Sequence, residues 1–167
     1  MNQECPQLAS LSEDVRKFWE EKQITLQDTL LRFSYAVLTV PSGFTTIEKS
    51  GLLYLMKRNL WFEDFPKSST FSVLFQRSSQ YEKMLLQLPV ETVEQVQVVP
   101  QFALSTFFSE FPARTGPFQW IARMFGTGRT GPKYLCVAGK DVSRVDVRYA
   151  FRDVTEPEVW AQAIMDR

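Results

Sequence analysis

The sequence predicts an α+β fold that is mainly β, in which a series of strands is followed by one terminal helix. Two dense apolar runs flank the polar turn Lys57–Asn59 and are each too short for an ordinary helix, which is typical of a β-hairpin. Apolar and polar residues alternate strictly near residues 145–152, which indicates a strand with one buried face. The chain then changes period and ends in an amphipathic helix that carries Trp160.

The composition favours one folded domain without catalytic chemistry. The chain has 167 residues, 44% of them hydrophobic, with 14 Phe, 5 Tyr and 4 Trp, enough for a large aromatic core. It contains no histidine, which removes the Ser-His-Asp arrangement, most zinc sites and the usual general base near neutral pH. We therefore expect a protein that is not an enzyme and that needs no cofactor or metal.

The sequence favours a cytoplasmic location, either free or peripheral on the cytosolic face of a membrane. No apolar run approaches the roughly 20 residues that a membrane-spanning helix needs. The N-terminus lacks the basic start and apolar run of a signal peptide. In that compartment Cys5 and Cys136 are expected to be free thiols.

Residues 1–29 are predicted to form a helical extension. Ser10 and Glu13 have the spacing of a capping box, and a helix over 12–22 would place Val15, Phe18 and Trp19 on one side. A second short helix is expected to start at Thr25. The domain itself, residues 30–167, then opens with a strand at 33–40 that the Pro41–Gly43 sequence ends.

The middle of the chain predicts further strands and a long insertion. Strands are expected at 51–56, 60–65, 71–76 and 90–99, with Val96 and Val98 facing one way, while 81–88 fits either strand or helix. Residues 101–132 mix Pro, Gly, Arg and aromatic residues and read as an insertion loop, with a short helix over 118–125. Loops of this length inside compact domains are often functional.

The last third returns to regular structure. A strand is predicted at 134–138, and a second one has Val145, Val147, Tyr149 and Phe151 on its core face. Thr155 and Glu158 form a second capping-box pattern, with Pro157 in the first turn of the final helix. Trp160 and Ile164 lie on one stripe of that helix, and we expect Trp160 in the core.

This order of elements resembles the pleckstrin-homology (PH) and GRAM superfamily over roughly residues 30–166. Gly51–Leu55 followed by Leu60–Glu63 looks like the opening of a GRAM domain, with its glycine, its tyrosine and a buried phenylalanine on the next strand. Arg148–Asp153 resembles the last strand, and Trp160 resembles the tryptophan that plugs one end of the barrel. The resemblance implies a strongly bent antiparallel β-barrel or sandwich of about seven strands, capped by the C-terminal helix.

The resemblance also implies a scaffold that binds phosphoinositides, other membrane components or proteins. Lipid-binding members carry basic residues on the first two strands and around the loop between them, where this chain has Lys49, Lys57 and Arg58. The second strand, however, carries Glu63 and Asp64, where a phosphate ligand would need a cation.

The insertion adds aromatic and basic side chains that fit three roles. Apolar tips such as Trp120 with nearby cations would enter a membrane interface, pack on the domain, or anchor a partner protein. For a lipid or anion we expect contacts from the loop cations Arg123, Arg129 and Lys133, and for a protein partner from Phe118 and Trp120.

Two other groups are candidates for partner contact. Arg144, Arg148 and Arg152 are expected on one strand face, which is either simply solvated or binds an anion or acidic partner. In the N-terminal helix, Phe18 and Trp19 would anchor the helix on the domain or anchor a partner.

One glycine motif is typical of a dinucleotide-binding site but lacks the helix that such a site needs after it. Residues 126–131 match G-x-G-x-x-G, yet Pro132 and a strand follow where a dinucleotide site needs a helix.

Taken together, the sequence favours a non-catalytic PH-like module that recruits a protein partner or a membrane for targeting, tethering or assembly. The alternative is a peripheral domain that binds phosphoinositides or other anionic lipids; nucleic acid is disfavoured by the net charge of zero.

Overall fold

The fold is α+β and mainly β, as the sequence predicts. The computed structural model describes residues 5–42, 45–65, 84–109 and 131–167. In chain order the elements are η1 (Pro6–Ser10), α1 (Glu13–Leu26), β1 (Leu30–Ser42), β2 (Thr45–Met56), β3 (Asn59–Asp64), β4 (Leu85–Pro89), η2 (Val90–Thr92), β5 (Val93–Pro100), η3 (Gln101–Ala103), α3 (Leu104–Phe108), β6 (Lys133–Lys140), β7 (Asp146–Arg152) and α5 (Pro157–Met165). The final helix and the hairpin around Lys57–Asn59 are confirmed.

The strands form one seven-stranded antiparallel sheet in the order β4-β3-β2-β1-β7-β6-β5. Strand β1 pairs with β2 along its length but with β7 only through Val37–Thr39, so it joins two smaller groups of strands. Among the described strands the sheet is not closed, and the expected barrel is wrong in that respect. In the described part of the chain, β4 and β5 are the two edges, since η2 connects them but they share no ladder.

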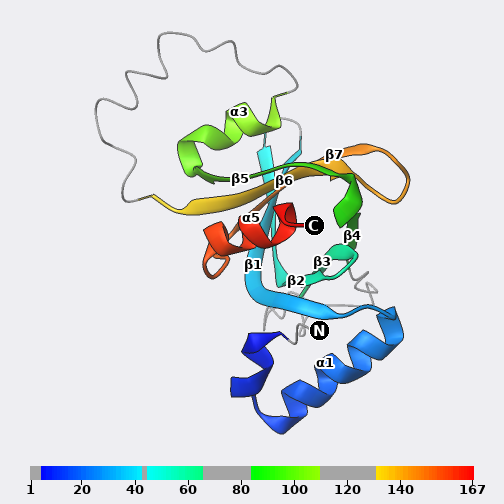
Figure 1. Cartoon of the computed structure of the whole chain (residues 1–167). Helices are drawn as coiled ribbons and strands as arrows, with labels where there is room; N and C mark the ends of the chain where they lie inside the picture. The colour runs from blue at the N-terminus through cyan, green and yellow to red at the C-terminus, as the bar shows by residue number, and fades with distance from the viewer. Residues whose placement is uncertain (1–4, 43–44, 66–83, 110–130) are drawn as a thin grey trace, which may run out of the picture.

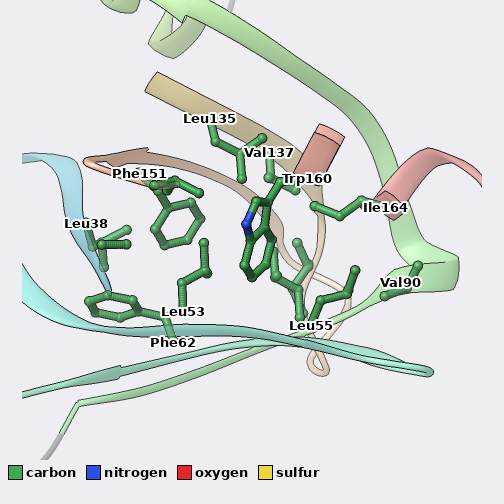
Figure 2. Packing of buried hydrophobic residues seen from close by; sticks show 14 residues of the cluster. Leu38, Leu53, Leu55, Phe62, Val90, Leu135, Val137, Phe151, Trp160 and Ile164 are labelled. Atoms are coloured by element: carbon green, nitrogen blue, oxygen red, sulfur yellow. The ribbon is translucent and has the colours of Figure 1, made fainter. Parts of the chain in front are cut away.

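The main core lies between the two groups of strands. Figure 1 shows α5 in the space between β5–β7 and β1–β3. Figure 2 shows Trp160 and Ile164 of α5 among Leu53, Phe62 and Leu135 from the surrounding strands. Trp160 has no exposed surface, which confirms its expected place in the core.

Two smaller clusters cover the opposite faces of the strands. Below β1–β3 in Figure 1, α1 places Trp19 against residues that include Phe33, Tyr54 and Trp61. Above β5–β7, α3 contributes Phe107 to a cluster with Cys136 and other small side chains. Both thiols are buried and free, as predicted.

The N-terminal segment also covers part of an open strand edge. Among the described residues, the first half of β1 pairs with no strand on the side of β7. There the side-chain amide of Gln7 takes the place of a strand: Nε2 donates to the carbonyl of Phe33 at 3.2 Å, and Oε1 accepts the N–H of Phe33 at 3.0 Å. Both backbone groups of Phe33 are thereby satisfied.

Several expected boundaries were wrong near the N-terminus. Helix α1 continues to Leu26, so Thr25 starts no second helix, and Gln27 ends α1 in the left-handed conformation with φ 49°. Strand β1 continues through Pro41, because that residue lies beyond Thr39, the last residue paired with β7, and its missing N–H removes no bond there.

Neither capping box forms. The N-cap of α1 is Ser12, whose side chain makes no capping bond, while the hydroxyl of Ser10 donates to the carbonyl of Gln7. The N-cap of α5 is Glu156, and Thr155 instead bonds Ser34 through its backbone N–H at 3.0 Å. The sequence pattern was matched, but the hydroxyl of Ser10 bonds within η1, and the hydroxyl of Thr155 accepts a bond from Ser34 Oγ of β1 at 3.4 Å.

The middle region is only partly described. The ambiguous segment 81–88 contains the start of β4 at Leu85, and the strand expected at 90–99 begins at Val93 after η2. Residues 101–108 of the expected insertion form η3 and α3. The strand predicted at 71–76, the helix predicted over 118–125 and the glycine motif before Gly131 lie outside the described residues.

Candidate functional site

The three basic residues expected around the hairpin do not form one site. Lys49 lies within β2, whereas Lys57 and Arg58 form the turn after it. Seven residues of β2 separate Lys49 from Lys57, which puts the two Cα atoms eight steps of extended chain apart, a span of roughly 26 Å. Lys49 Nζ is 3.5 Å from the buried carboxylate of Asp64, so this cation is committed to an internal ion pair.

The acids of β3 hold the fold together rather than face a ligand. Glu63 is buried and bonds both Lys22 of α1 and the hydroxyl of Tyr54. Lys22 Nζ also lies 4.9 Å from the centre of the Tyr54 ring. Burial, followed by the bond and the charge of Glu63, raises the pKa of Tyr54. This network fixes α1 to the sheet.

The expected arginine face is divided among different partners. Arg144 is exposed and lies in the turn before β7, with φ 62°, so its placement on the strand was wrong. Arg148 Nη1 donates to the carbonyls of Phe107 at 2.7 Å and Ser109 at 2.6 Å. Arg148 therefore caps the C-terminal end of α3.

Arg152 is the third member of that expected face. It lies 3.5 Å from Glu48 and 3.3 Å from Asp153. Burial would lower the pKa of Arg152, but the two carboxylates outweigh burial and raise it. Two of the three arginines thus bond within the fold, whereas Arg144 lies in the turn that precedes the strand.

The two aromatic residues expected to act together on α1 have different roles. Trp19 is 2% exposed and packs on Phe33 and Tyr54, with ring centres 4.9 and 5.5 Å away. It anchors α1 on the sheet, so it has no free surface for a partner. Phe18 is 47% exposed and touches Trp19 edge-on. Phe18 is therefore the member of this pair that faces outward.

Among the residues expected in the insertion, Lys133 is described and begins β6. It pairs with Glu158 of α5, and that bond lowers the pKa of the Glu158 carboxyl. The other expected contacts, Arg123, Arg129, Phe118 and Trp120, lie outside the described residues.

Sequence reasoning missed an exposed aromatic pair. Tyr35 on β1 and Phe65 after β3 stack with ring centres 6.4 Å apart, and each keeps nearly half of its surface exposed. Their partnership depends on the β1–β2 register, which pairs Tyr35 with Leu52. No sequence motif indicates this aromatic pair, since the two residues are 30 positions apart.

Sequence reasoning also missed a cavity at the end of the sheet. The turn between β2 and β3 and the η2 turn line a cavity of about 370 Å³ together with Arg167, which lies two residues beyond the end of α5. Its lining combines polar and apolar surface and includes three cations, among them the expected Lys57 and Arg58; the full set is Lys57, Arg58, Asn59, Pro89, Val90, Glu91 and Arg167. The distant residue Arg167 could not be assigned to this place from the sequence.

Two other kinds of site were sought in the same ranges. Among residues 5–42, 45–65, 84–109 and 131–167, no three or more His, Cys, Asp or Glu side chains gather so that they could hold a metal ion. Within that part of the chain, no helix has the length and apolar character to cross a membrane.

Comparisons with known proteins assign neither a family nor a function to this chain. No family model matches the chain, and no curated protein matches it. Among solved structures, it is similar to the crystal structure of the C-terminal domain of an unknown protein from Leishmania infantum, with a TM-score of 0.43 and 10% identity. That match covers 91% of this chain and 95% of the other, and at this TM-score it supports no assignment of fold family or function.

Proposed function

We propose that this chain is a non-catalytic, PH-like binding module that recruits a protein partner in targeting, tethering or assembly. The strand order supports a PH-like scaffold, because an antiparallel series of seven strands is followed by one helix whose tryptophan fills the core. The absence of histidine from the sequence supports a role without catalysis. We propose a cytoplasmic location, including the cytosolic face of a membrane.

The observation that carries the choice of a protein partner is the pairing of the basic side chains. Lys49, Arg148 and Arg152 are engaged by carboxylates or carbonyls of the same chain. The carboxylates offset the charge of Lys49 and Arg152, and the two carbonyls occupy N–H donors of Arg148 that a lipid head group would need. Exposed aromatic rings, in contrast, are typical anchors of protein interfaces, and Phe18 on α1 is one of them.

The alternative is a peripheral domain that binds anionic lipid. Lys57 and Arg58 favour it, since both are exposed on the turn between β2 and β3. Co-sedimentation with vesicles of phosphatidylcholine, with and without phosphoinositide, at low and physiological salt distinguishes the two functions. We expect weak binding that modest salt removes; specific binding at physiological salt would favour the lipid function.

A second experiment tests partner recruitment through α1. A photo-crosslinking residue at position 18 is compared with the same residue at position 24, where Ile24 is 77% exposed on the same helix. We expect the crosslinking residue at position 18 to capture one discrete protein. With the crosslinking residue at a neighbouring site instead, Phe18→Ala is expected to abolish that capture. Equal crosslinking from both positions would mean that α1 has no specific partner at Phe18.

A further inference from the structure

The face of the sheet that is turned away from the main core is covered at its two ends. Helix α1 packs on one end through the cluster around Trp19, and α3 packs on the other through the cluster that contains Ala150. Both clusters lie on the same face, because Phe33 and Thr39 share one side of β1 and Thr39 pairs with Ala150. Tyr35 lies on that side of β1 too, between the two covered ends.

Apolar side chains are exposed in this middle part of the face. Tyr35 and Phe65 stack on each other and are 49% and 46% exposed. Leu52, which pairs with Tyr35, is partly buried and packs on the cluster around Trp19. The N–H of Phe65 donates to the carbonyl of Ser50 at 2.8 Å, so the aromatic pair is held on the sheet before a partner arrives.

Phe18 borders the same region from the side of α1. The centre of its ring lies 5.5 Å from Lys22 Nζ, and Lys22 bonds Glu63. Glu63 pairs with Leu52, which in turn pairs with Tyr35, so two strand spacings, roughly 10 Å, lie between Glu63 and Tyr35. One helix with its side chains is about as wide. The α1-side surface consists of Phe18, Tyr35, Leu52 and Phe65.

The rim of the α1-side surface along α1 is acidic. Asp14 and Glu21 stand four residues before and three residues after Phe18, so they share its side of the helix. Both are exposed, and no ion pair within the described residues includes either of them. Over its whole length α1 exposes four carboxylates, at positions 13, 14, 20 and 21, against two cations, at positions 16 and 17.

The charges at the other end of the α1-side surface are already paired. Arg152 lies 3.5 Å from Glu48, and Lys49 lies 3.5 Å from Asp64. The uncompensated charge near the exposed rings is therefore the negative charge of α1. Such carboxylates attract the cations of a basic protein and repel the anionic head groups of a membrane.

We propose that the α1-side surface binds a basic amphipathic helix of a protein partner, laid beside α1. This inference rests on the partner recruitment proposed above and names the chemistry of that partner. A helix fits because helices already cover both ends of this face, and an apolar sheet face is typically buried under helices. The apolar stripe of the partner helix contacts the exposed rings, and its Lys or Arg side chains reach Asp14 and Glu21.

Two helical peptides test the charge of the partner. Both match α1 in length, at 14 residues, and carry Leu on one stripe. The remaining positions are Lys in one peptide and Glu in the other. Fluorescence anisotropy of each labelled peptide with the whole chain at physiological salt is expected to show at least tenfold tighter binding of the Lys peptide. Equal binding of the two peptides, or no binding of the Lys peptide, would overturn the proposal.

Charge reversal on α1 locates the binding. Asp14→Lys with Glu21→Lys reverses the rim and is expected to weaken binding of the Lys peptide at least tenfold. Glu13→Lys with Glu20→Lys makes the same change of charge on the opposite side of the helix and is expected to weaken binding less than threefold. Equal weakening by the two pairs of substitutions would contradict binding beside Phe18.

The aromatic pair is tested with the same peptide. Tyr35→Ser with Phe65→Ser is expected to weaken binding at least tenfold. Ile24→Ser with Ile47→Ser removes two exposed apolar side chains outside the α1-side surface and is expected to leave binding unchanged. Thermal unfolding of each variant confirms that it folds. An equal loss of binding in this control would overturn the proposal.

Two further results separate this inference from other readings of the surface. If a discrete protein crosslinks to position 18 and Asp14→Lys with Glu21→Lys leaves its capture unchanged, the recruitment function stands and the basic partner is wrong. Size-exclusion chromatography of the chain alone tests a second copy as the occupant. A dimer that Tyr35→Ser with Phe65→Ser dissociates would overturn the proposal, and a monomer is expected.

Discussion

The ring of Phe62 lies directly against Gly51, so that a Cβ placed on Gly51 would stand 2.6 Å from Phe62 Cζ and 2.2 Å from the carbonyl oxygen of Glu63. Because the second obstacle is backbone, the strand pair itself would have to shift. We expect Gly51→Ala to lower the free energy of unfolding by about 1–3 kcal/mol, the usual range for overpacking. Chemical denaturation measures this, and Gly131→Ala is the control, since no atom lies within 4 Å of a Cβ there. Equal effects of the two changes would contradict the close packing of Phe62 on Gly51.

Trp160 combines complete burial with an indole N–H that has no hydrogen-bond partner within the described part of the chain. Trp160→Ala should cost about 3–5 kcal/mol, because it removes a large side chain from the centre of the main core. Trp160→Phe keeps much of the apolar contact and removes the unpaired N–H, so we expect it to cost less than half as much. Urea titrations of both variants provide the comparison; a phenylalanine variant as unstable as the alanine variant would mean that the indole N–H is bonded.

Arg148 is predicted to control access to Cys136 through α3. Helix α3 and Cys136 share one buried cluster, and Arg148 caps the carbonyls of Phe107 and Ser109 at the end of that helix. Arg148→Ala should loosen α3 and speed thiol labelling at Cys136 by roughly tenfold, equivalent to about 1.4 kcal/mol of local stability. Labelling is followed by mass spectrometry in a Cys5→Ser background. Arg144→Ala removes an exposed arginine of the neighbouring turn and is expected to leave the rate unchanged.

The stability of the fold is predicted to fall at alkaline pH, partly because of Cys136. Burial raises the pKa of the Cys136 thiol from 9.0 to about 12. A group whose pKa is raised on folding stabilises the native state below its unfolded pKa and loses that contribution as pH rises towards the folded value. Between pH 9 and 12 the loss due to this thiol approaches 1.4 kcal/mol per pH unit. Cys136→Ala should therefore be less stable than the wild type at pH 7 but show a shallower decline above pH 9 in guanidinium titrations. If the free energies of unfolding of the two proteins decline in parallel above pH 9, folding does not raise the pKa of Cys136.

The sequence allowed the main architectural elements to be predicted because their signals are local. The alternation of Val147, Tyr149 and Phe151 identifies β7, and the apolar stripe that carries Trp160 identifies α5. The expected place of Val145 on the same core face was wrong, because Val145 precedes β7 and is 58% exposed. Each of these signals depends only on the spacing of apolar residues within a single strand or helix. The sheet order and the open edges at β4 and β5 depend instead on pairing between distant segments, which no local period specifies.

The candidate residues were predicted less well for a related reason. A basic residue in a sequence shows its charge but not its partner, so Arg148 and Arg152 looked like one free face although Phe107, Ser109 and Glu48 engage them. Likewise Glu63 looked like an obstacle to phosphate binding, whereas the fold uses it to hold Lys22 and Tyr54. Lys57 and Arg58 are exposed on the turn between β2 and β3, and Arg167 lies beside them only through the tertiary structure.

The bond between Gln7 and Phe33 has a consequence for how the chain behaves when its first residues are removed. Gln7 masks backbone groups that would otherwise invite another extended segment to add to β1. A protease that cuts between η1 and β1 would remove Gln7 and leave those backbone groups of β1 unbonded. If Trp19 is removed as well, the apolar side chains that it covers become exposed. The trimmed protein should then self-associate through β1 and scatter light at concentrations where the intact chain stays clear.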